Sequence, residues 1–399
     1  MEMRLFPLAL LAATLALAPP AQAVSDRASQ QTTVLVSRAR DGGLPNGAST
    51  NAVISRDRRW ARLIAFQSDA SNLVKGDTNG FTDVFAVRRA GRITNRGTKW
   101  RRGRTRLMSH ARGGGPANGP SRAPAVDGAL HKEPRCVAFL SAASNLVRRD
   151  PNGRVDAFVA NVRTRRVRRV SFGNTDATQV AVSGDCSRVA FVSGGVVWVR
   201  VRGHTVRVGR GSDPYFSTGL RNDLVYGGRR GVYLSRNGTK RPWLVAPSGR
   251  DPAFNDVRRR VVAYERRKGG HWQVMFREIG RGERAASAHG STLGNGDSRD
   301  PVIGNSGYYI AFETEASNLG VNATGRRGDF NDVPDTYLYT GVRDLTLVQS
   351  VEEKAVPLGG GGRHPSMSFY ANYFLFDSPA PLGSRFGASQ VWMCYLGGV

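Results

Sequence analysis

The sequence predicts an all-β fold, a single β-propeller of seven four-stranded blades rather than six or eight. The first observation is a repeated phrase, because Ala-Ser-Asn-Leu occurs at residues 70–73, 143–146 and 316–319. Each copy follows an apolar, strand-like run that ends in an aromatic residue. Repeats separated by tens of residues indicate a copied unit that buries its apolar faces only against its neighbours.

The number of units comes from the aromatic residue that ends the strongest strand of each copy. The markers are Phe66, Phe139, Phe191, Tyr226, Tyr264, Phe312 and Phe376. The third unit shows the strand pattern most clearly, with runs at 179–182, 188–192, 197–201 and 205–208 separated by glycine-containing turns. Four antiparallel strands per unit are typical of a propeller blade.

Each blade is expected to begin with an entry strand, and a proline marks most of these starts. The dipeptides are Ala123-Pro124, Asp213-Pro214, Asp251-Pro252, Asp300-Pro301 and His364-Pro365. Proline suits the first residue of a strand, where its missing N–H costs least.

The two ends of the chain are expected to pair and close the ring. The blades are predicted at about residues 49–110, 121–172, 177–209, 212–246, 250–288, 299–350 and 363–396. The last of them lacks an outer strand, whereas residues 32–38 have an outer-strand pattern without a blade of their own. Closure by these two segments removes exposed sheet edges.

The first residues resemble a secretory signal peptide. Arg4 precedes an apolar run over residues 5–18, which ends before the small-residue site Ala21-Gln22-Ala23. We therefore predict a signal peptide over residues 1–23 and a propeller domain over residues 24–399. The mature protein is expected to be a monomer, secreted or in the periplasm or cell envelope, with no transmembrane segment after cleavage.

The chain is strongly basic, with 58 Lys and Arg against 31 Asp and Glu and a formal net charge of +27. Such a charge attracts polyanions, although it also keeps an exported protein soluble. Basic residues cluster in two places, along residues 99–106 with Trp100 among them, and at Arg163, Arg165, Arg166, Arg168 and Arg169. These clusters suggest either an anion-binding surface or charged blade edges that discourage aggregation.

Three cysteines in an exported chain predict one disulfide and one free thiol. Cys136 and Cys186 precede equivalent central strands in neighbouring units, so they are the expected pair. Cys394 is then expected to be a buried thiol.

An acidic loop with constant spacing follows each copy of the repeated phrase. Its polar residues are Asp77, Asn79 and Asp83, then Asp150, Asn152 and Asp156, then Asp329, Asn331 and Asp335. Oxygen ligands at alternating positions are what Ca²⁺ requires. Asp and Asn also stabilise turns by bonding to their own backbone, without any metal. Calcium and a metal-free turn are both consistent with this spacing, and no other cofactor is expected.

Catalytic motifs are absent from the sequence. It contains no Gly-x-Ser-x-Gly nucleophile elbow, and its six histidines are scattered. Paired carboxylates such as Glu313 and Glu315, which flank the sixth central strand, are candidates for glycoside chemistry. We therefore expect a protein that is not an enzyme.

The repeats also resemble a known family. Val-Ala-Phe-x-Ser, Ala-Ser-Asn-Leu-Val, residues 76–80 (Gly-Asp-Thr-Asn-Gly) and Asp83-Val84-Phe85 are similar to the TolB-like propeller repeats of exported bacterial proteins. The resemblance is clear in the first, second and sixth units. It implies a propeller that binds other macromolecules.

Three functions follow from these observations. The first is a non-enzymatic scaffold that binds a protein or peptide in the cell envelope or outside the cell. The second is a basic surface protein that binds anionic cell-wall polymers or other polyanions, with no specific nucleic acid. The third is a carbohydrate-active or hydrolytic enzyme.

Overall fold

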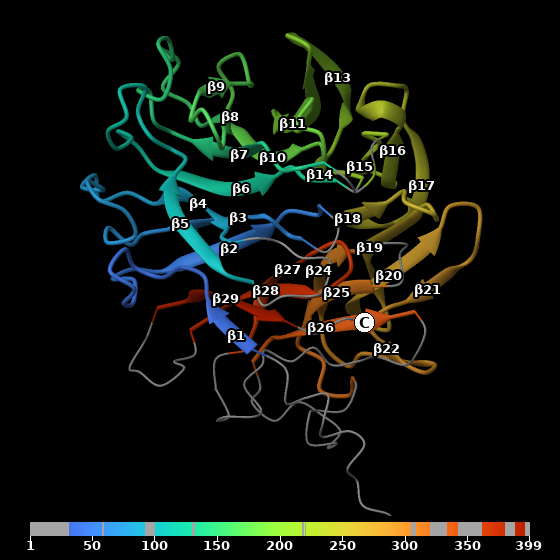
Figure 1. The fold of residues 1–399 in the computed structure, drawn as a ribbon. Coiled ribbons are helices and arrows are strands. Elements are labelled where there is room, and N and C mark those ends of the chain that lie inside the picture. Colours follow the sequence, from blue (N-terminus) through green and yellow to red (C-terminus); the bar gives the residue numbers. More distant parts are fainter. Residues whose placement is uncertain are drawn as a thin grey trace, which may run out of the picture.

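The fold was analysed in a computed structural model, which describes residues 32–57, 60–91, 100–129, 132–217, 219, 221–304, 309–319, 333–341, 361–379 and 388–395. The sheets form a seven-bladed β-propeller, as the sequence predicts (Figure 1). The first strand of every blade lies near the centre of the ring, and the outer strands lie at its periphery. The predicted signal peptide lies outside the described residues.

Blades 1 to 4 are complete four-stranded antiparallel sheets with their strands in sequence order. Blade 1 consists of β2 (Ser49–Ile54), β3 (Leu63–Ser68), β4 (Asp83–Arg89) and β5 (Arg102–Leu107). Blade 2 consists of β6 (Ser121–Val126), β7 (Cys136–Ser141), β8 (Asp156–Asn161) and β9 (Val167–Arg169). Blade 3 consists of β10 (Ala177–Val182), β11 (Arg188–Ser193), β12 (Val196–Val201) and β13 (His204–Arg210). Blade 4 consists of β14 (Ser212–Phe216), β15 (Leu224–Gly228), β16 (Gly231–Ser235) and β17 (Trp243–Pro247), with the short 3₁₀ helix η1 (Arg236–Gly238) between its last two strands.

Blades 5 to 7 continue the ring. Blade 5 consists of β18 (Arg250–Asn255), β19 (Val261–Lys268), β20 (His271–Glu278) and β21 (Glu283–Ala285), and the hairpin β22 (Ala288–His289) and β23 (Thr292–Leu293) follows it. The described part of blade 6 consists of β24 (Ser298–Ile303), β25 (Tyr309–Thr314) and β26 (Asp335–Thr340). Blade 7 consists of β27 (Arg363–Met367), β28 (Tyr373–Ser378), β29 (Gln390–Tyr395) and β1 (Thr32–Leu35).

The predicted closure of the ring is confirmed. Strand β1 pairs antiparallel with β29 and supplies the outer strand of blade 7. The Ser37 hydroxyl donates to Oε1 of Gln390 over 2.8 Å and extends the junction beyond the strand. The paired segment is shorter than the predicted 32–38, because the chain bends away after Leu35.

The core lies between the blades, which explains why the central strands are apolar on both faces. The central strand of blade 2, β7, is buried along its whole length. Aromatic residues on the central and third strands face each other with centroids 5.9 Å apart in Phe66–Phe85 and Phe139–Phe158, and 6.0 Å apart in Phe312–Tyr337. These cross-strand aromatic pairs stabilise each sheet and fill the space between neighbouring blades.

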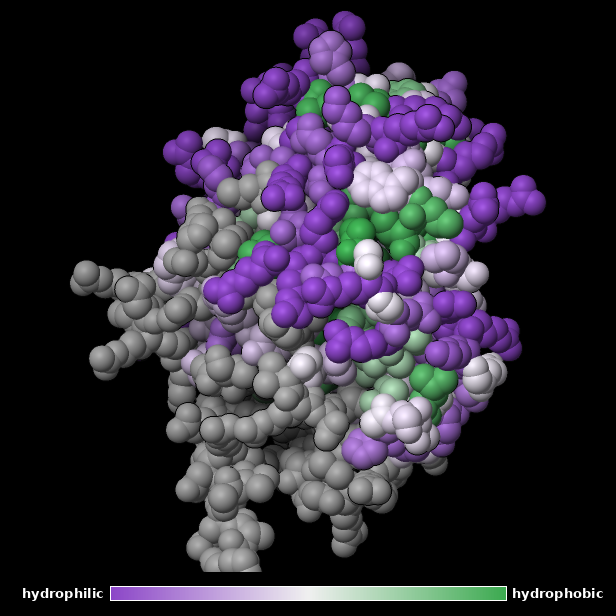
Figure 2. Space-filling model, turned by 90° about the vertical axis from the view of Figure 1, so that its right-hand side faces the viewer, coloured by the Kyte–Doolittle hydropathy of each residue, from purple (hydrophilic) through white to green (hydrophobic). Residues whose placement is uncertain are grey.

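The outer surface is mostly polar. On the side that carries β17, β20 and β21, hydrophilic residues surround small apolar areas (Figure 2). Within the described residues, no helix has the length and apolar character of a membrane span.

The repeated phrase closes a hydrogen-bonded clasp. In blade 2, the side-chain amide of Asn118 donates to Ser144 Oγ over 2.9 Å, and Ser144 N donates back to Asn118 Oδ1 over 2.9 Å. The side chain of Asn145 accepts from Asn118 N over 3.1 Å. Blades 1 and 6 repeat this clasp with Asn46, Ser71 and Asn72, and with Asn295, Ser317 and Asn318. The phrase is therefore a structural element that ties the loop entering the blade to the loop after its central strand.

The clasp also requires a glycine after each asparagine. A Cβ atom at Gly47 would lie 2.7 Å from the carbonyl carbon of Asp69, and one at Gly296 would lie 2.5 Å from the carbonyl oxygen of Glu315. These close approaches explain the Asn-Gly pairs at 46–47, 118–119 and 295–296.

Replacing the clasp asparagine is expected to destabilise the protein. Asn118→Ala removes the three hydrogen bonds that this side chain forms with Ser144 Oγ, Ser144 N and Asn145 N, and should cost about 1–2 kcal/mol. That loss should lower Tm by a few degrees, roughly 2–4 °C per kcal/mol, in a thermal melt. The control is Asn174→Ala in the exposed loop after β9, which should melt like the wild type. Equal melting temperatures for the two variants would contradict the role of the clasp.

Candidate functional site

The central channel is lined by an unusual residue in most entry strands. Six of these residues have a left-handed backbone, with φ of +52° at Asn51 and Ala123, +53° at Asp213, +43° at Asp251, +51° at Asp300 and +50° at His364. In each of these strands the register with the central strand shifts at this point, which marks a β-bulge. The prolines that follow therefore lie inside the entry strands, and the prediction that they begin those strands is wrong.

The bulges connect neighbouring blades. Five of the six turn a backbone N–H toward the preceding blade, where a side chain accepts it. The pairs are Asn51 N to Asp377 Oδ2 (2.6 Å), Ala123 N to Gln67 Oε1 (2.9 Å), Asp300 N to Glu265 Oε1 (2.9 Å) and His364 N to Glu313 Oε2 (3.3 Å). All four acceptors directly follow the central aromatic residue of their blade. At the junction of blades 3 and 4, Asp213 N donates instead to Gln179 Oε1 of an entry strand over 2.6 Å.

Three carboxyl groups converge at one side of the channel. Ligand oxygens of Asp251, Glu265 and Asp300 all lie within 4.8 Å of one another. The guanidinium of Arg250 pairs with Glu265 over 2.9 Å and stacks on the ring of Trp272, with Cζ 3.3 Å from the ring centroid. Among the described residues, no basic side chain forms an ion pair with Asp251 or Asp300.

Burial raises the pKa of Asp251 well above its usual range, and the neighbouring charges of Glu265 and Asp300 raise it further. Burial, followed by the charge of Asp300, also raises the pKa of Glu313. In the neighbouring blade 7, Nδ1 of His364 lies 2.9 Å from Asp377 Oδ2, and this hydrogen bond is the main cause of a raised His364 pKa. The channel therefore concentrates carboxyl groups in a protein that is strongly basic as a whole.

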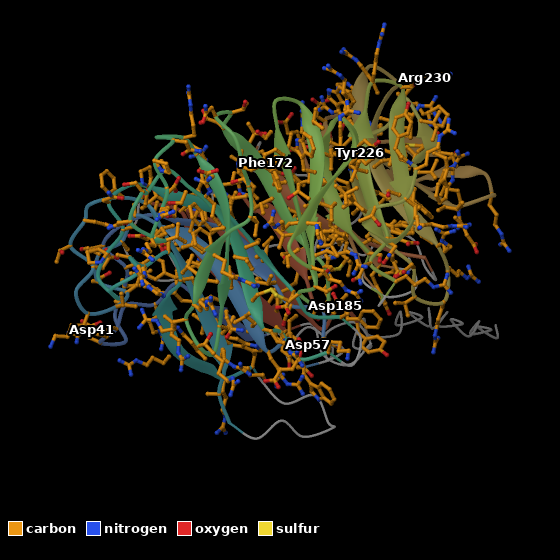
Figure 3. All side chains as sticks on the ribbon, turned by 90° about the horizontal axis from the view of Figure 1, so that it is seen from above. Asp41, Asp57, Phe172, Asp185, Tyr226 and Arg230 are labelled. Atoms are coloured by element: carbon orange, nitrogen blue, oxygen red, sulfur yellow. A yellow bond between two sulfur atoms is a disulfide. The ribbon has the colours of Figure 1, made fainter. Side chains whose placement is uncertain are left out.

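These side chains border a cavity of about 370 Å³, which is lined by Asn51, Gln179, Asp213, Asp251, Asp300 and His364 together with the channel prolines. A second cavity of about 230 Å³ adjoins it, and Tyr215 lines both. The guanidinium of Arg56 lies over the Tyr215 ring, 4.6 Å from its centroid. Figure 3 shows Asp57 and Asp185, in turns between entry and central strands, toward one side of the ring and Arg230 toward the other.

The first predicted acidic loop is held by hydrogen bonds within the protein. The side-chain amide of Asn79 donates to Asp83 Oδ2 over 2.7 Å, while its Oδ1 accepts from Phe81 N over 3.0 Å. Ser109 Oγ donates to the other oxygen of Asp83 over 2.5 Å. Asp77 is buried beside this network, and burial together with the charge of Asp83 raises its pKa to about 6. The structure thus brings Asp77 and Asp83 together, with the Asn79 amide N–H turned toward Asp83.

The aspartates of the second loop pair with an arginine of strand β9. Arg169 NH1 lies 2.5 Å from Asp150 Oδ1 and 3.3 Å from Asp156 Oδ2. The amide of Asn152 points elsewhere and donates to the carbonyl oxygen of Gly173 over 2.9 Å. In blade 1, Leu107 pairs with Phe85 at the register position where Arg169 pairs with Phe158 in blade 2.

The third loop is only partly described. Asp329 and Asn331 lie outside the described residues, and Asp335 is a buried residue at the start of β26.

The other predicted candidates have structural contacts. Trp100 is 4% exposed, and its indole N–H donates to the carbonyl oxygen of Ala61 over 2.8 Å, so it is not available for stacking on a ligand. Glu313 accepts a hydrogen bond from the backbone N–H of His364 in blade 7, whereas Glu315 is exposed in the loop that follows β25. The sequence does not identify the channel residues, because an X-Pro dipeptide is equally typical of the start of a strand.

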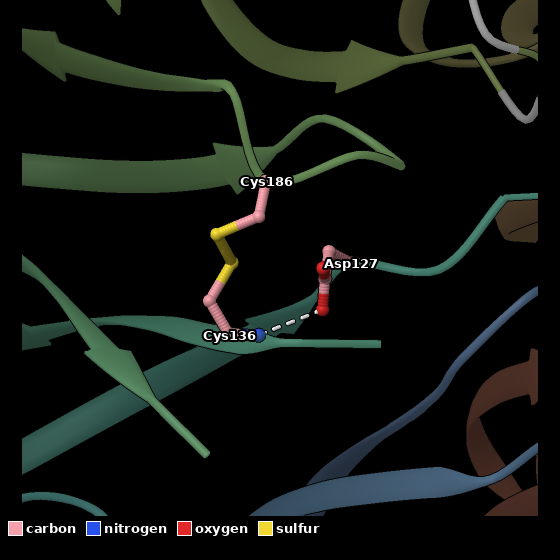
Figure 4. Close-up of side chains that lie close together, drawn as sticks. All are labelled: Asp127, Cys136 and Cys186. Carbon is pink, nitrogen blue, oxygen red and sulfur yellow. Dashed lines mark hydrogen bonds between the residues drawn. A yellow bond between two sulfur atoms is a disulfide. The ribbon is translucent and has the colours of Figure 1, made fainter. Parts of the chain in front are cut away.

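The two cysteines predicted to pair are joined in the structure. Cys394 is a buried thiol. Cys136 and Cys186 form a disulfide with an S–S distance of 2.01 Å between blades 2 and 3 (Figure 4). Asp127 lies beside it and accepts from Cys136 N over 2.9 Å. Burial is the main cause that raises the pKa of Asp127 to about 7.

A scan against protein-family models and a search of curated proteins found no match. Among solved structures, the chain is similar to the β-propeller domain of the trilobed protease from Pyrococcus furiosus, with a TM-score of 0.50 and 10% identity over 88% of this chain and 97% of that one. The acylaminoacyl peptidase of Pyrococcus horikoshii gives a TM-score of 0.51 and 10% identity over 87% of this chain and 51% of that one, so the chain spans about half its length. TolB from Acinetobacter baumannii is more distant, with a TM-score of 0.40 and 11% identity over 66% of this chain and 64% of that one.

The propeller fold is established. It is the fold that the TolB-like repeats imply. Because identities near 10% show only a shared fold, and the similar structures include an enzyme, they do not confirm a non-enzymatic role.

Calcium is not expected to stabilise the acidic loops of blades 1 and 2. Asp150 and Asp156 already contact Arg169, and the Asn79 amide already donates to Asp83. Thermal melts of the wild type and Asp77→Asn, each with Ca²⁺ and with chelator, check this expectation. A rise in Tm on adding Ca²⁺ to the wild type, absent in Asp77→Asn, would instead establish that the loop of blade 1 binds Ca²⁺.

Asp127 is expected to make stability fall as pH rises. Its folded pKa of about 7 lies above the ordinary value of 3.8, so its contribution is complete below pH 3.8 and is lost as pH rises through about 7. Asp127→Asn keeps an oxygen acceptor but cannot ionise. The Tm of this variant minus that of the wild type should therefore increase between pH 5 and pH 8, by roughly 2 °C or more. A difference that stays constant or falls would show that Asp127 ionises normally in the folded protein.

Proposed function

We propose that this protein is a non-enzymatic binding propeller, an exported scaffold that holds a cationic group of a partner protein or peptide at the acidic side of its channel. One observation carries this proposal. Asp213, Asp251 and Asp300 stand on left-handed bulges of three consecutive entry strands after β10 and line a single cavity. Left-handed backbone at non-glycine residues is strained and concentrates at functional sites.

The charge distribution supports a cationic ligand. A chain of net charge +27 repels cations in general, so cation binding needs a local site. The carboxyl groups of Asp251 and Asp300 have no ion-pair partner among the described residues, and proximity raises the pKa of Asp251. A lysine, an arginine or a chain amino terminus would relieve this repulsion.

The size and lining of the cavity favour the binding of a ligand over catalysis. About 370 Å³ accommodates one or two side chains. No serine or cysteine is among the residues lining it, and its histidine, His364, is bonded to Asp377. Glu265 and Glu313, the nearby glutamates, accept backbone N–H groups from the next blade.

The test compares peptides that differ only in charge. A panel of lysine-containing, neutral and aspartate-containing peptides is titrated by fluorescence anisotropy against the wild type and the double variant Asp251→Asn/Asp300→Asn. Asparagine tolerates the left-handed backbone, so the fold should be retained. We expect the lysine-containing peptides alone to bind, with affinity reduced about tenfold or more in the double variant, which corresponds to about 1.4 kcal/mol.

The control is Asp41→Asn, which removes the same kind of charge from an exposed loop and keeps the acceptor for Gly43 N. Equal peptide binding by the double variant and the wild type would refute the site. Cleavage of any bound peptide, detected by mass spectrometry, would refute the non-enzymatic role.

A further inference from the structure

A groove between blades 1 and 2 gathers basic side chains from separate segments. Its volume is about 480 Å³, and its lining includes Arg40, Lys75, Arg102, Arg104, Arg106 and Arg165. These residues come from the loop after β1, the loop after β3, strand β5 and the turn between β8 and β9. No acidic residue is among those that line the groove.

Two of the arginines are fixed in place by backbone carbonyl groups. Arg102 donates to the carbonyl oxygens of Val36 over 3.0 Å and of Arg38 over 2.7 Å. Arg106 donates to the carbonyl oxygen of Val162 over 3.1 Å and thereby joins blade 1 to blade 2. Their guanidinium groups bond without a carboxylate, so their positive charge is not neutralised.

The positive charges of the groove residues lie close together and repel one another. Burial lowers the pKa of Arg102, and the nearby charge of Arg38 lowers it further. Arg40, Lys75 and Arg104 are exposed and form no ion pair with a described residue. Arg169, in contrast, lies in the neighbouring blade between two aspartates. An anion in the groove would relieve the repulsion that the protein leaves uncompensated.

The backbone leaves room for such a ligand. Gly76 and Gly114 have φ of +80° and +93°, and a Cβ atom at either would meet nothing within 4 Å. Together with Gly115 they form an open rim on one wall of the groove. Small residues at the rim let a polymer backbone approach the arginines closely.

Phosphate on an extended chain fits this arrangement best. The planar guanidinium donates two parallel hydrogen bonds to phosphate oxygens, and five of the six basic lining residues are arginines. Alternate residues of a strand share one face, so Arg104 and Arg106 lie on the same face of β5, whereas a β-bulge between Thr105 and Arg102 breaks this alternation at Arg102. All three arginines still line the groove. A groove with several cations is complementary to repeated anions, whereas one small anion would contact only part of it.

We propose that this groove binds a linear polymer that carries phosphate groups along its backbone, at a site separate from the acidic channel. Arg102 and Arg106 supply fixed charges on the groove wall. Arg40, Lys75 and Arg104 close onto the polymer from the rim.

Binding of sodium polyphosphate, measured by calorimetry over a range of salt concentrations, tests the proposal. The variant Arg40→Gln/Lys75→Gln/Arg104→Gln removes three exposed charges and leaves the anchored arginines and the channel carboxylates in place. We expect its affinity to fall more than tenfold near 0.15 M salt. The slope of log affinity against log salt should decrease by about 2, as expected for the loss of three phosphate contacts on a flexible chain.

The matched control is Arg229→Gln/Arg230→Gln/Arg267→Gln, which removes three exposed charges from blades 4 and 5. It should retain wild-type affinity and slope. Equal losses in the two triple variants would show that only net charge matters and would overturn the proposal. Equally tight wild-type binding of polyglutamate would overturn the preference for phosphate.

A second measurement uses the unmodified protein. Phenylglyoxal labels accessible arginines, and mass spectrometry then locates the labels. Polyphosphate should protect Arg40 and Arg104 but not Arg229 and Arg230. Uniform protection of all four, or none at Arg104, would contradict binding in the groove.

Discussion

The hydrogen bonds that join neighbouring blades at the channel are the constraint on which the ring depends. Each blade is a separate sheet, so hydrogen bonding within sheets cannot set the angle between blades. The bulged entry strands solve this problem by turning a backbone N–H toward a side chain of the preceding blade, as Asn51 does toward Asp377 and Asp300 toward Glu265. A buried N–H without a partner costs about 1–3 kcal/mol, so each junction favours one arrangement of the two blades.

This constraint also explains where the acidic residues lie. Four junctions use an acceptor directly after the central aromatic residue, and Gln67 shows that an uncharged amide can take this place as well as Glu265 or Asp377. Carboxyl groups at several of these positions, together with Asp251 and Asp300 on the bulges, therefore give the channel more acidic side chains than the hydrogen bonds between blades require. The basic groove is the opposite case, because its arginines are anchored by carbonyl oxygens and keep their charge. We therefore propose ligands of opposite charge for the two sites.

The most recognisable part of the sequence turned out to be structural. The Ala-Ser-Asn-Leu phrase is repeated because Ser144, Asn145 and their counterparts all clasp an Asn-Gly loop of the same geometry. The spacing of the acidic loops is shared for a similar reason, since Asp83 and Asp156 each accept a hydrogen bond from a serine hydroxyl two residues after the outer strand of the blade. The positions that differ among the copies, such as Leu107 and Arg169, give each blade its own chemistry.

The sequence by itself determined the fold class, the blade number and the closure of the ring. These features depend on local pattern, because strand periodicity, turn residues and repeated aromatics are visible along the chain. Only the tertiary structure decided which charges meet. Asp251 and Asp300 are 49 residues apart, and Arg40 and Arg165 are 125 apart, by subtraction of their positions. Such residues share a site because ring closure brings successive blades together, and no local pattern encodes the direction in which their side chains point.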